Sequence, residues 1–528
     1  MRKLVRARHC GSKLACDGQV PVEKALTIAK QIAGAPEAAH GSETAVDTPP
    51  SPVLKRPSES GDMHLDSPSK VLLISHTFPP DAQVGARRVA EFCRYLPEFG
   101  LQPVVLTIED RFRQSVDLSL PPIVGIRNER TEVTATPLDW YKRSKVFLGM
   151  LRRFEQSVQP PVAEGRPHFL KRHLTKLLQF PGPDSGWYRP ALRAAERLIR
   201  EESPVAIFSS GPPAVSHRIA CRLKREHNLP WIADFRDPWA TCPYENDDPG
   251  WWRWVNRYLE SKCVRAADLV ICNTEGIRQN FLKSYPDLPQ QRFVTLTNGF
   301  VDHRPLPANE TPVRTRRLFL HLGSLYHLRR IDTFCSAVES LVKAQELDPA
   351  TFQIVFLGFV DSSLEVAARK AAPTLFRLGC IEFRPRVDKQ DALQILCQAD
   401  MLLVFQGGFH LQVPAKFYEY LATGQRIFAV AQKGALTDML EQTGSGLWAD
   451  PEDPAEIAAN FLRALALPVA SPEAAQERWY GQFHYRSLTA RLAAHFRDLA
   501  FDRDVPRASV AGSAIASSPF RAKAKPCG

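Results

Sequence analysis

Residues 413–430, VPAKFYEYLATGQRIFAV, place two charged side chains on one short predicted helix. Pro414 suits the first turn of that helix, where its missing N–H is no loss, and Gly424 suits its end. Lys416 and Glu419 lie close together near the start. A helix start attracts phosphate through unpaired N–H groups and the helix dipole, and a nearby carboxylate can accept hydrogen bonds from a ribose diol. The segment therefore predicts a nucleotide site, and a core helix with a surface Lys–Glu pair is the alternative.

A second charged turn occurs in residues 321–334, HLGSLYHLRRIDTF. Gly323 and Ser324 lie between a predicted strand and a predicted helix, and Arg329 and Arg330 enter the helix. Cations at such a turn can neutralise a pyrophosphate. We predict that Arg330 contacts a diphosphate, with help from Lys416 or backbone N–H groups. An ordinary surface charge is the alternative.

Two further segments carry polar residues where predicted strands of the first half end. In HTFPPDAQVGARR, Gly85 would let the backbone approach a ligand closely, and Arg87 begins the next helix. In IADFRDPW, Asp234 and Arg236 follow a strand, where polar residues serve ligands more often than packing. An internal Asp–Arg salt bridge that shapes the loop is the alternative for this second segment.

The elements that must position these residues alternate between short apolar runs and helical patterns, which is typical of parallel sheets covered by helices. The predicted strands of the first half are 70–76, 102–108, 205–210, 231–235, 269–274 and 293–300. Those of the second half are 318–324, 354–359, 381–386, 401–406 and 426–431. We predict two Rossmann-like, doubly wound α/β domains that face a central cleft, because ligands bind at the carboxyl ends of such strands.

Composition sets the boundaries of these domains. We predict a disordered extension over residues 1–69, a first domain over 70–304, a proline-containing linker over 305–317 and a second domain over 318–470. One terminal helix over 471–500 and a disordered tail over 501–528 follow. The chain of 528 residues is long enough for two such domains.

The charge and the cysteine content of the chain bear on its ligand class, its redox compartment and the presence of a metal site. The net charge of +11 suits a phosphate-bearing ligand, an anionic membrane or nucleic acid. Nucleic acid is the poorest match, because the basic residues form no stripe interleaved with aromatic residues. The 11 cysteines form no CxxC pair, and no DxD motif or spaced histidine cluster indicates a metal. We expect a reducing compartment, no metal site and no cofactor.

The sequence has no apolar run of the roughly 20 residues that a membrane span requires, and its basic start lacks a signal-peptide core. We therefore expect a cytoplasmic protein. Residues 142–154 combine basic and apolar side chains in a helical pattern, which would suit peripheral attachment to the inner face of an anionic membrane. Packing of the apolar stripe on the first domain is the alternative.

The segment from Pro414 to Gly424 resembles the nucleotide-sugar motif of the large family 4 type of retaining GT-B glycosyltransferases. A bacterial subgroup involved in cell-surface polysaccharide synthesis has the pattern P-x-K-x-x-E-Y-L-A-x-G, which this chain matches. Many members carry two glutamates around this helix. Glu419 matches the second, whereas Leu411 stands in place of the first, and Ser324 stands where an arginine follows the glycine of the turn.

The resemblance implies that Gly323, Ser324, Pro414 and Glu419 bind the donor, with Glu419 on the ribose. It also implies donor contacts for the loop that contains Gly85 and Arg87, and for the turn at Asn298, for which a plain Asn-Gly turn is the alternative. The leaving diphosphate would be stabilised by Arg330 and Lys416, without a metal. Asp234 and Arg236 would complete the catalytic cleft on the acceptor side.

The implied reaction moves a sugar from a nucleotide diphosphate-sugar to a polysaccharide or lipid-linked acceptor, with retention at the anomeric carbon. A nucleotide-sugar epimerase and a non-catalytic nucleotide-sugar-binding protein are the alternatives. The absent first glutamate and the serine at position 324 favour the second of these alternatives.

Overall fold

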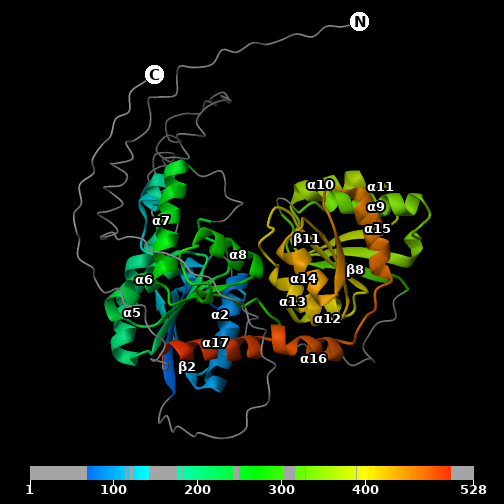
Figure 1. The fold of residues 1–528 in the computed structure, drawn as a ribbon. Coiled ribbons are helices and arrows are strands. Elements are labelled where there is room, and N and C mark those ends of the chain that lie inside the picture. Colours follow the sequence, from blue (N-terminus) through cyan, green and yellow to red (C-terminus); the bar gives the residue numbers. More distant parts are fainter. Residues whose placement is uncertain are drawn as a thin grey trace, which may run out of the picture.

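The computed structural model describes residues 68–500, apart from 114–115, 118–122, 142–175, 181, 183, 242–248, 303–314, 327–328 and 388. Two α/β units lie side by side, each built around a parallel sheet (Figure 1). The predicted pair of doubly wound domains is therefore confirmed. The tail 501–528 and the basic segment 142–154 lie wholly outside the described residues. All but the last residues of the predicted extension 1–69 and of the linker 305–317 also lie outside them.

The first sheet has the strand order β3-β2-β1-β4-β5-β6-β7, and neighbouring strands pair in parallel. Its strands are β1 (Ser69–Ser75), β2 (Leu101–Ile108), β3 (Arg127–Thr131), β4 (Ala206–Gly211), β5 (Trp231–Phe235), β6 (Leu269–Cys272) and β7 (Phe293–Thr295). Its helices include α2 (Val84–Tyr95), α5 (Tyr188–Glu202), α6 (Val215–His227), α7 (Gly250–Ala266) and α8 (Glu275–Ser284).

The second sheet has the order β10-β9-β8-β11-β12-β13 and is also parallel. Its strands are β8 (Arg317–Leu322), β9 (Phe352–Leu357), β10 (Ile381–Arg384), β11 (Met401–Gln406), β12 (Arg426–Ala431) and β13 (Gly446–Ala449). Its helices include α9 (Ile331–Lys343), α10 (Ser362–Ala371), α11 (Pro373–Arg377), α12 (Lys389–Cys397), α13 (Ala415–Leu421), α14 (Ala435–Thr443) and α15 (Pro454–Leu465).

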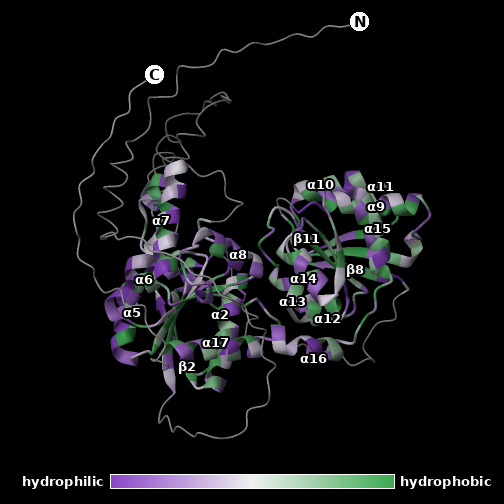
Figure 2. Ribbon diagram, in the orientation of Figure 1, coloured by the Kyte–Doolittle hydropathy of each residue, from purple (hydrophilic) through white to green (hydrophobic). Residues whose placement is uncertain are grey.

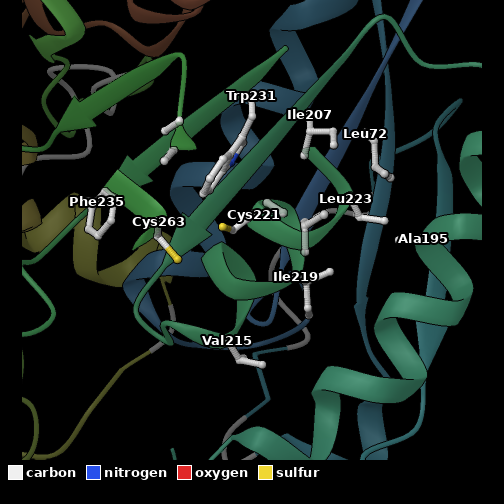
Figure 3. Close-up of a cluster of buried hydrophobic side chains, with 14 of the residues drawn as sticks. Leu72, Ala195, Ile207, Val215, Ile219, Cys221, Leu223, Trp231, Phe235 and Cys263 are labelled. Atoms are coloured by element: carbon white, nitrogen blue, oxygen red, sulfur yellow. The ribbon is translucent and has the colours of Figure 1, made fainter. Parts of the chain in front are cut away.

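Both faces of each sheet are buried, and strand β1 shows how. Leu72 and Ile74 belong to the core cluster that includes α5, α6 and α8, whereas Val71 and Leu73 belong to the cluster on the opposite face. Alternate side chains of a strand point to opposite faces, so a strand covered on both sides is apolar throughout. Figure 3 shows the first cluster, where Trp231 of β5 lies close to residues of α6. Green hydrophobic strands accordingly lie inside both domains in Figure 2.

The end of the described chain departs from the prediction of one helix over 471–500. Two helices form instead, α16 (Pro472–Phe483) and α17 (Tyr485–Ala500). The break arises because the backbone N–H of Phe300 donates to the carbonyl of Phe483, and that of Tyr485 donates to the carbonyl of Phe300 (both 3.0 Å). These groups pair with another segment instead of continuing the helix.

This break returns the chain to the first domain. Helix α16 packs on the second domain through Trp479 and Phe483, whereas Leu492 and Phe496 of α17 are fully buried in the core cluster of the first domain that contains β1. Figure 1 shows α17 beside α2, with α16 running to the other domain. The two C-terminal helices therefore join both domains. No helix in the described part of the chain is long and apolar enough to cross a membrane.

We predict that Phe496→Ala lowers the free energy of unfolding by about 3–5 kcal/mol, because a buried aromatic ring is lost and a cavity remains. Urea unfolding of the full chain, followed by tryptophan fluorescence, measures this. Ala494→Gln, on the exposed side of the same helix, is the control and should change stability little. If Phe496→Ala changed stability as little as Ala494→Gln, α17 would contribute nothing to the hydrophobic core of the first domain.

Candidate functional site

The loops at the carboxyl ends of the two sheets contact each other directly. Thr274 Oγ1, after β6, donates to the carbonyl of Leu411 (2.5 Å), and Gln412 Nε2 donates to Asp237 Oδ1, after β5 (2.6 Å). Arg87 of α2 forms an ion pair with Glu419 of α13. Two of the predicted site residues, Arg87 and Glu419, therefore meet across the interface between the domains.

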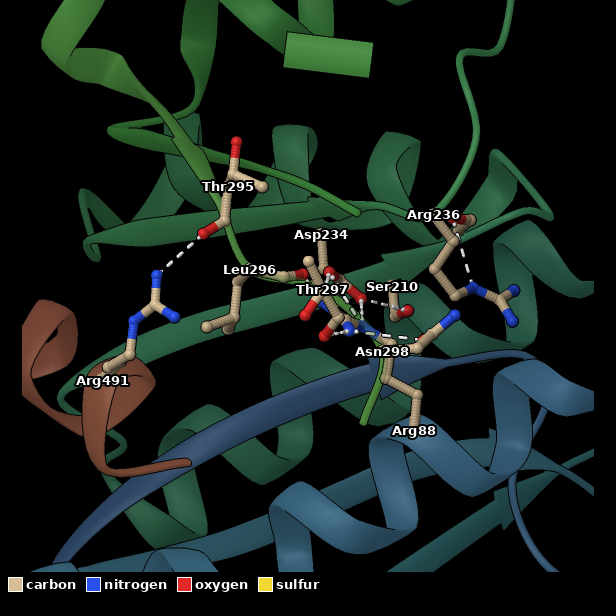
Figure 4. A network of polar contacts seen from close by, with 10 residues as sticks. Arg88, Ser210, Asp234, Arg236, Thr295, Leu296, Thr297, Asn298 and Arg491 are labelled. Atoms are coloured by element: carbon tan, nitrogen blue, oxygen red, sulfur yellow. Dashed lines mark hydrogen bonds and ion pairs between the residues drawn. The ribbon is translucent and has the colours of Figure 1, made fainter. Parts of the chain in front are cut away.

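A buried arginine organises the first domain's side of this interface (Figure 4). Arg88 and Asp234 have fully buried side chains, and Arg88 Nη2 lies 2.8 Å from Asp234 Oδ1. Arg88 also donates to the carbonyls of Leu296 and Thr297, and Ser210 Oγ donates to Asp234 Oδ2 (2.7 Å). Strand β7 ends at Thr295, shorter than predicted, where its partner β6 also ends, and the next two carbonyls accept hydrogen bonds from Arg88.

This network changes the interpretation of Asp234 and Asn298. The sequence predicts that Asp234 contributes to the catalytic cleft, but its carboxylate is buried and bound to Arg88 and Ser210. Asn298, predicted to bind the donor, is 5% exposed, and its side-chain oxygen lies 3.4 Å from Arg88 Nη1. An internal Asp–Arg ion pair, the alternative, is therefore present, although the partner is Arg88 and not the neighbouring Arg236.

The guanidinium of Arg236 occupies the space beside Gly85. A Cβ atom at Gly85 would lie 1.2 Å from Arg236 Nη1, so a larger residue at position 85 would require this guanidinium to shift. Arg236 Nε also lies 3.4 Å from the carbonyl of Gly211, and its Nη2 donates to the carbonyl of Pro212. Gly85 thus makes room for a side chain of the same domain, where the sequence predicts a close approach to a ligand.

Arg87 and Glu419, both predicted to contact the donor, are brought together as partners. Their side chains are 21% and 14% exposed, respectively. Arg87 Nε and Nη2 are buried and have no hydrogen-bond partner among the described residues. Buried N–H groups without partners carry a free-energy penalty. A ligand oxygen at this point would remove that penalty.

The second domain's side of the interface is built on two glycine turns. Gly323 and Gly358 have φ values of +122° and +138°, which residues with a Cβ rarely adopt. A Cβ at Gly323 would lie 2.7 Å from Lys416 Nζ, so the ammonium group lies directly against this turn. Pro414 is the N-cap of α13, one position before the first helical residue. The structure thus brings together Gly323 and Lys416, two residues that the sequence assigns to the donor site.

The environment of Lys416 makes its charge sensitive to pH. Burial, followed by the nearby charge of Arg329, lowers the pKa of the Lys416 ammonium from 10.5 to about 7. Its nearest polar partner is His321, with Lys416 Nζ 3.3 Å from His321 Nε2. Sequence reasoning assigned no ligand role to His321, although a histidine inside the apolar strand LFLHL was a visible signal.

Arg330, predicted to contact the diphosphate, is instead held by carboxylates. Its Nε lies 2.9 Å from Asp332 Oδ1, and its Nη1 lies 3.1 Å from Glu452 Oε1. Arg329 bonds to the carbonyl of Ser324 in the glycine turn and lies over the ring of Tyr326 at 4.5 Å. The arginine that the structure brings to the turn is therefore Arg329. Within the described residues, no cluster of three or more His, Cys, Asp or Glu side chains could hold a metal.

We predict that Asp234→Ala lowers the free energy of unfolding by about 3–5 kcal/mol, since removing one partner of a buried ion pair leaves an uncompensated charge. Urea unfolding measures it, with Asp268→Ala as the control. Asp268 is a partly exposed partner of Lys224 at the opposite end of the sheet, before β6, and its loss should be smaller. If Asp234→Ala were as stable as the wild type, the buried charge of Arg88 would not require the carboxylate of Asp234.

Two family models match the chain in succession. A glycosyl transferase 4-like domain matches residues 85–299, and a glycosyl transferases group 1 domain matches residues 316–466. A curated relative, the probable glycosyltransferase WbjE of Pseudomonas aeruginosa, is 29% identical over 162 residues. That alignment covers 29% of this chain and 38% of the relative's length.

Solved structures share the two-domain architecture at low sequence identity. Sucrose-phosphate synthase from Thermosynechococcus elongatus has a TM-score of 0.55 at 16% identity, covering 82% of this chain and 99% of its own. Trehalose-6-phosphate from E. coli, bound with UDP-2-fluoro glucose, has a TM-score of 0.55 at 14% identity, covering 83% of this chain and 100% of its own. The fold is thus GT-B. The chain is similar to glycosyltransferases of this fold, because its first half matches a glycosyl transferase 4-like domain and its second half matches a group 1 domain.

Proposed function

We propose that the protein transfers a sugar from a nucleotide diphosphate-sugar to a polysaccharide or lipid-linked acceptor, with retention and without a metal. The observations that carry the proposal are the ion pair between Arg87 and Glu419 across the two domains and the place of Lys416, on the same helix as Glu419, against the Gly323 turn. These are one ammonium, one carboxylate and one guanidinium at the carboxyl ends of parallel strands, where open α/β sheets bind ligands. They suit a diphosphate and a ribose.

The difficult step of such a transfer is departure of the nucleoside diphosphate. Negative charge develops on the leaving phosphate, so preorganised cations and N–H groups directed at it lower the barrier most. Lys416 at the Gly323 turn and Arg329 beside it are suited to this role, together with the unpartnered N–H groups of Arg87. Arg330 takes part only if the donor draws it away from Asp332 and Glu452.

In the same proposal Glu419 accepts hydrogen bonds from the ribose diol. The donor then competes with Arg87 for this carboxylate, and each ribose hydroxyl that takes over an oxygen frees a guanidinium N–H for phosphate. Retention, the acceptor class and a place at the cytoplasmic face of a membrane rest on the resemblance and composition of the sequence. Arg236, which lies beside Gly85, is the remaining candidate on the acceptor side.

The first test of the proposed function is a thermal-shift titration of the full chain with uridine, guanosine and adenosine diphosphates and their sugar conjugates. Saturation at about 100 times Kd should add about 2.7 kcal/mol of stability. The preferred sugar conjugate is then incubated with lipid-linked and glycan acceptors, and the anomeric configuration of the product is read by NMR. Binding without turnover over all acceptors would favour a nucleotide-sugar-binding protein, and failure of every nucleotide to bind would exclude the proposal.

We predict that Glu419→Gln weakens binding of the preferred nucleoside diphosphate by about tenfold, because hydrogen bonds to a charged group contribute about 1.5–3 kcal/mol. Calorimetric titration measures the affinity. Binding of inorganic pyrophosphate, which has no ribose, should not weaken. Glu441→Gln is the matched control, since Glu441 lies on α14 and contacts Trp448. Equal weakening of both ligands would argue against a ribose contact.

We predict that affinity for the nucleoside diphosphate falls as pH rises above about 7. The pKa of Lys416 is lowered to about 7 in the free protein, and a bound diphosphate raises it again. Binding above pH 7 therefore takes up a proton, and affinity decreases by up to about tenfold per pH unit. Lys416→Met should abolish this dependence between about pH 7 and pH 9. A wild-type profile that is flat over this interval would show that Lys416 does not serve the diphosphate.

A further inference from the structure

His321 is a fully buried histidine in the central strand β8 of the second domain. Its Nδ1 lies 2.9 Å from the carbonyl oxygen of Leu403 in the neighbouring strand β11. Its ring also meets Phe405 at a centroid distance of 5.4 Å, nearly edge to face. The ring is therefore held by a hydrogen bond and by an aromatic contact, both to residues of strand β11.

The hydrogen bond to Leu403 determines which ring nitrogen carries the proton. A carbonyl oxygen only accepts, so Nδ1 must donate to it. Burial, with the charge of Lys416 next, lowers the pKa of His321 well below its ordinary value, so the ring is neutral. Its other nitrogen, Nε2, then has a free lone pair. That lone pair faces Lys416 Nζ at 3.3 Å and accepts a hydrogen bond from it.

The position of the Lys416 ammonium follows from this contact. Lysine has a flexible four-carbon chain and no fixed direction of its own. No carboxylate of the described residues forms a salt bridge with Lys416, and the charged group that affects its pKa is Arg329, which repels it. His321 on β8 is thus the polar partner that holds Nζ against the Gly323 turn.

We propose that His321 is a positioning residue that directs the Lys416 ammonium toward the donor diphosphate at the Gly323 turn. The proposal rests on the proposed function. A neutral imidazole suits this task better than a carboxylate. A carboxylate would orient the ammonium but also neutralise it, and the diphosphate would then meet a salt bridge in place of a net positive charge. The imidazole accepts one N–H of Lys416 and leaves two for phosphate oxygens.

The experiment compares His321→Phe with His321→Gln in the full chain. Phenylalanine fills the ring's space without an acceptor, whereas the side-chain oxygen of glutamine can reach the place of Nε2. Calorimetry measures the affinities of uridine, guanosine and adenosine diphosphates and of the corresponding nucleosides from about pH 6 to pH 9. The ratio of diphosphate affinity to nucleoside affinity isolates the phosphate contacts from general damage to the site.

We expect His321→Phe to reduce this ratio by about tenfold, as loss of one charge-assisted hydrogen bond predicts, and His321→Gln to restore most of it. A partner that merely supports the fold would change both affinities together and leave the ratio unaltered. A ratio within twofold of wild type for His321→Phe, or no rescue by His321→Gln, overturns the proposal. If no nucleoside diphosphate binds the wild type at any pH, the proposed function itself fails.

His321→Phe also puts an apolar ring into a polar environment, so a readout in the unmodified protein accompanies it. In wild-type protein labelled with ¹⁵N-lysine, NMR shows whether the Lys416 amine, identified by its loss in Lys416→Met, titrates in the free state and shifts when diphosphate is added. A Lys416 signal that keeps its position and pKa on saturation with diphosphate overturns the proposal without any variant at 321.

Discussion

The buried pair of Arg88 and Asp234 is the interaction on which the edge of the first domain that faces the second domain depends. It joins helix α2, strands β4 and β5 and the chain after β7, all far apart in sequence. A buried guanidinium is tolerated only where its N–H groups have partners, and here a carboxylate and two carbonyls supply them. The preceding residue, Arg87, is thereby held at the interface, where it reaches Glu419 of the other domain.

The partners that are available after folding also give neighbouring arginines different places in the structure. Arg87 and Arg88 are neighbours in the sequence, yet one is directed across the interface and the other into the core. Arg329 and Arg330 divide in a similar way, because Asp332 and Glu452 hold Arg330 while Arg329 contacts the glycine turn. In each pair the two arginines have different partners, so residues that are adjacent in the sequence have different environments in the fold.

On the second domain's side of the interface, burial among uncharged neighbours lowers the pKa of Lys416, because they do not stabilise its positive charge as a carboxylate would. Lys416 lies between a neutral imidazole and a glycine turn and is repelled by Arg329, so its proton is held less tightly than in an ordinary lysine. An anion that arrives there is stabilised both by the charge and by the removal of this repulsion. The return of α17 to the first domain links the two sides, because the C-terminal helices pack on both domains.

The sequence by itself determined the two parallel-sheet domains, since apolar runs alternating with helical segments have few other solutions. The sequence also indicated that Lys416 and Glu419 lie near each other on one short helix, because their spacing is local information. Tertiary structure alone decided the partners of Asp234 and Arg330 and the contact between His321 and Lys416. It also decided that Arg236 lies beside Gly85 and that the chain breaks between α16 and α17. These depend on which charges and backbone groups meet after folding, and pairing between residues distant along the chain leaves no periodic signal in a single sequence.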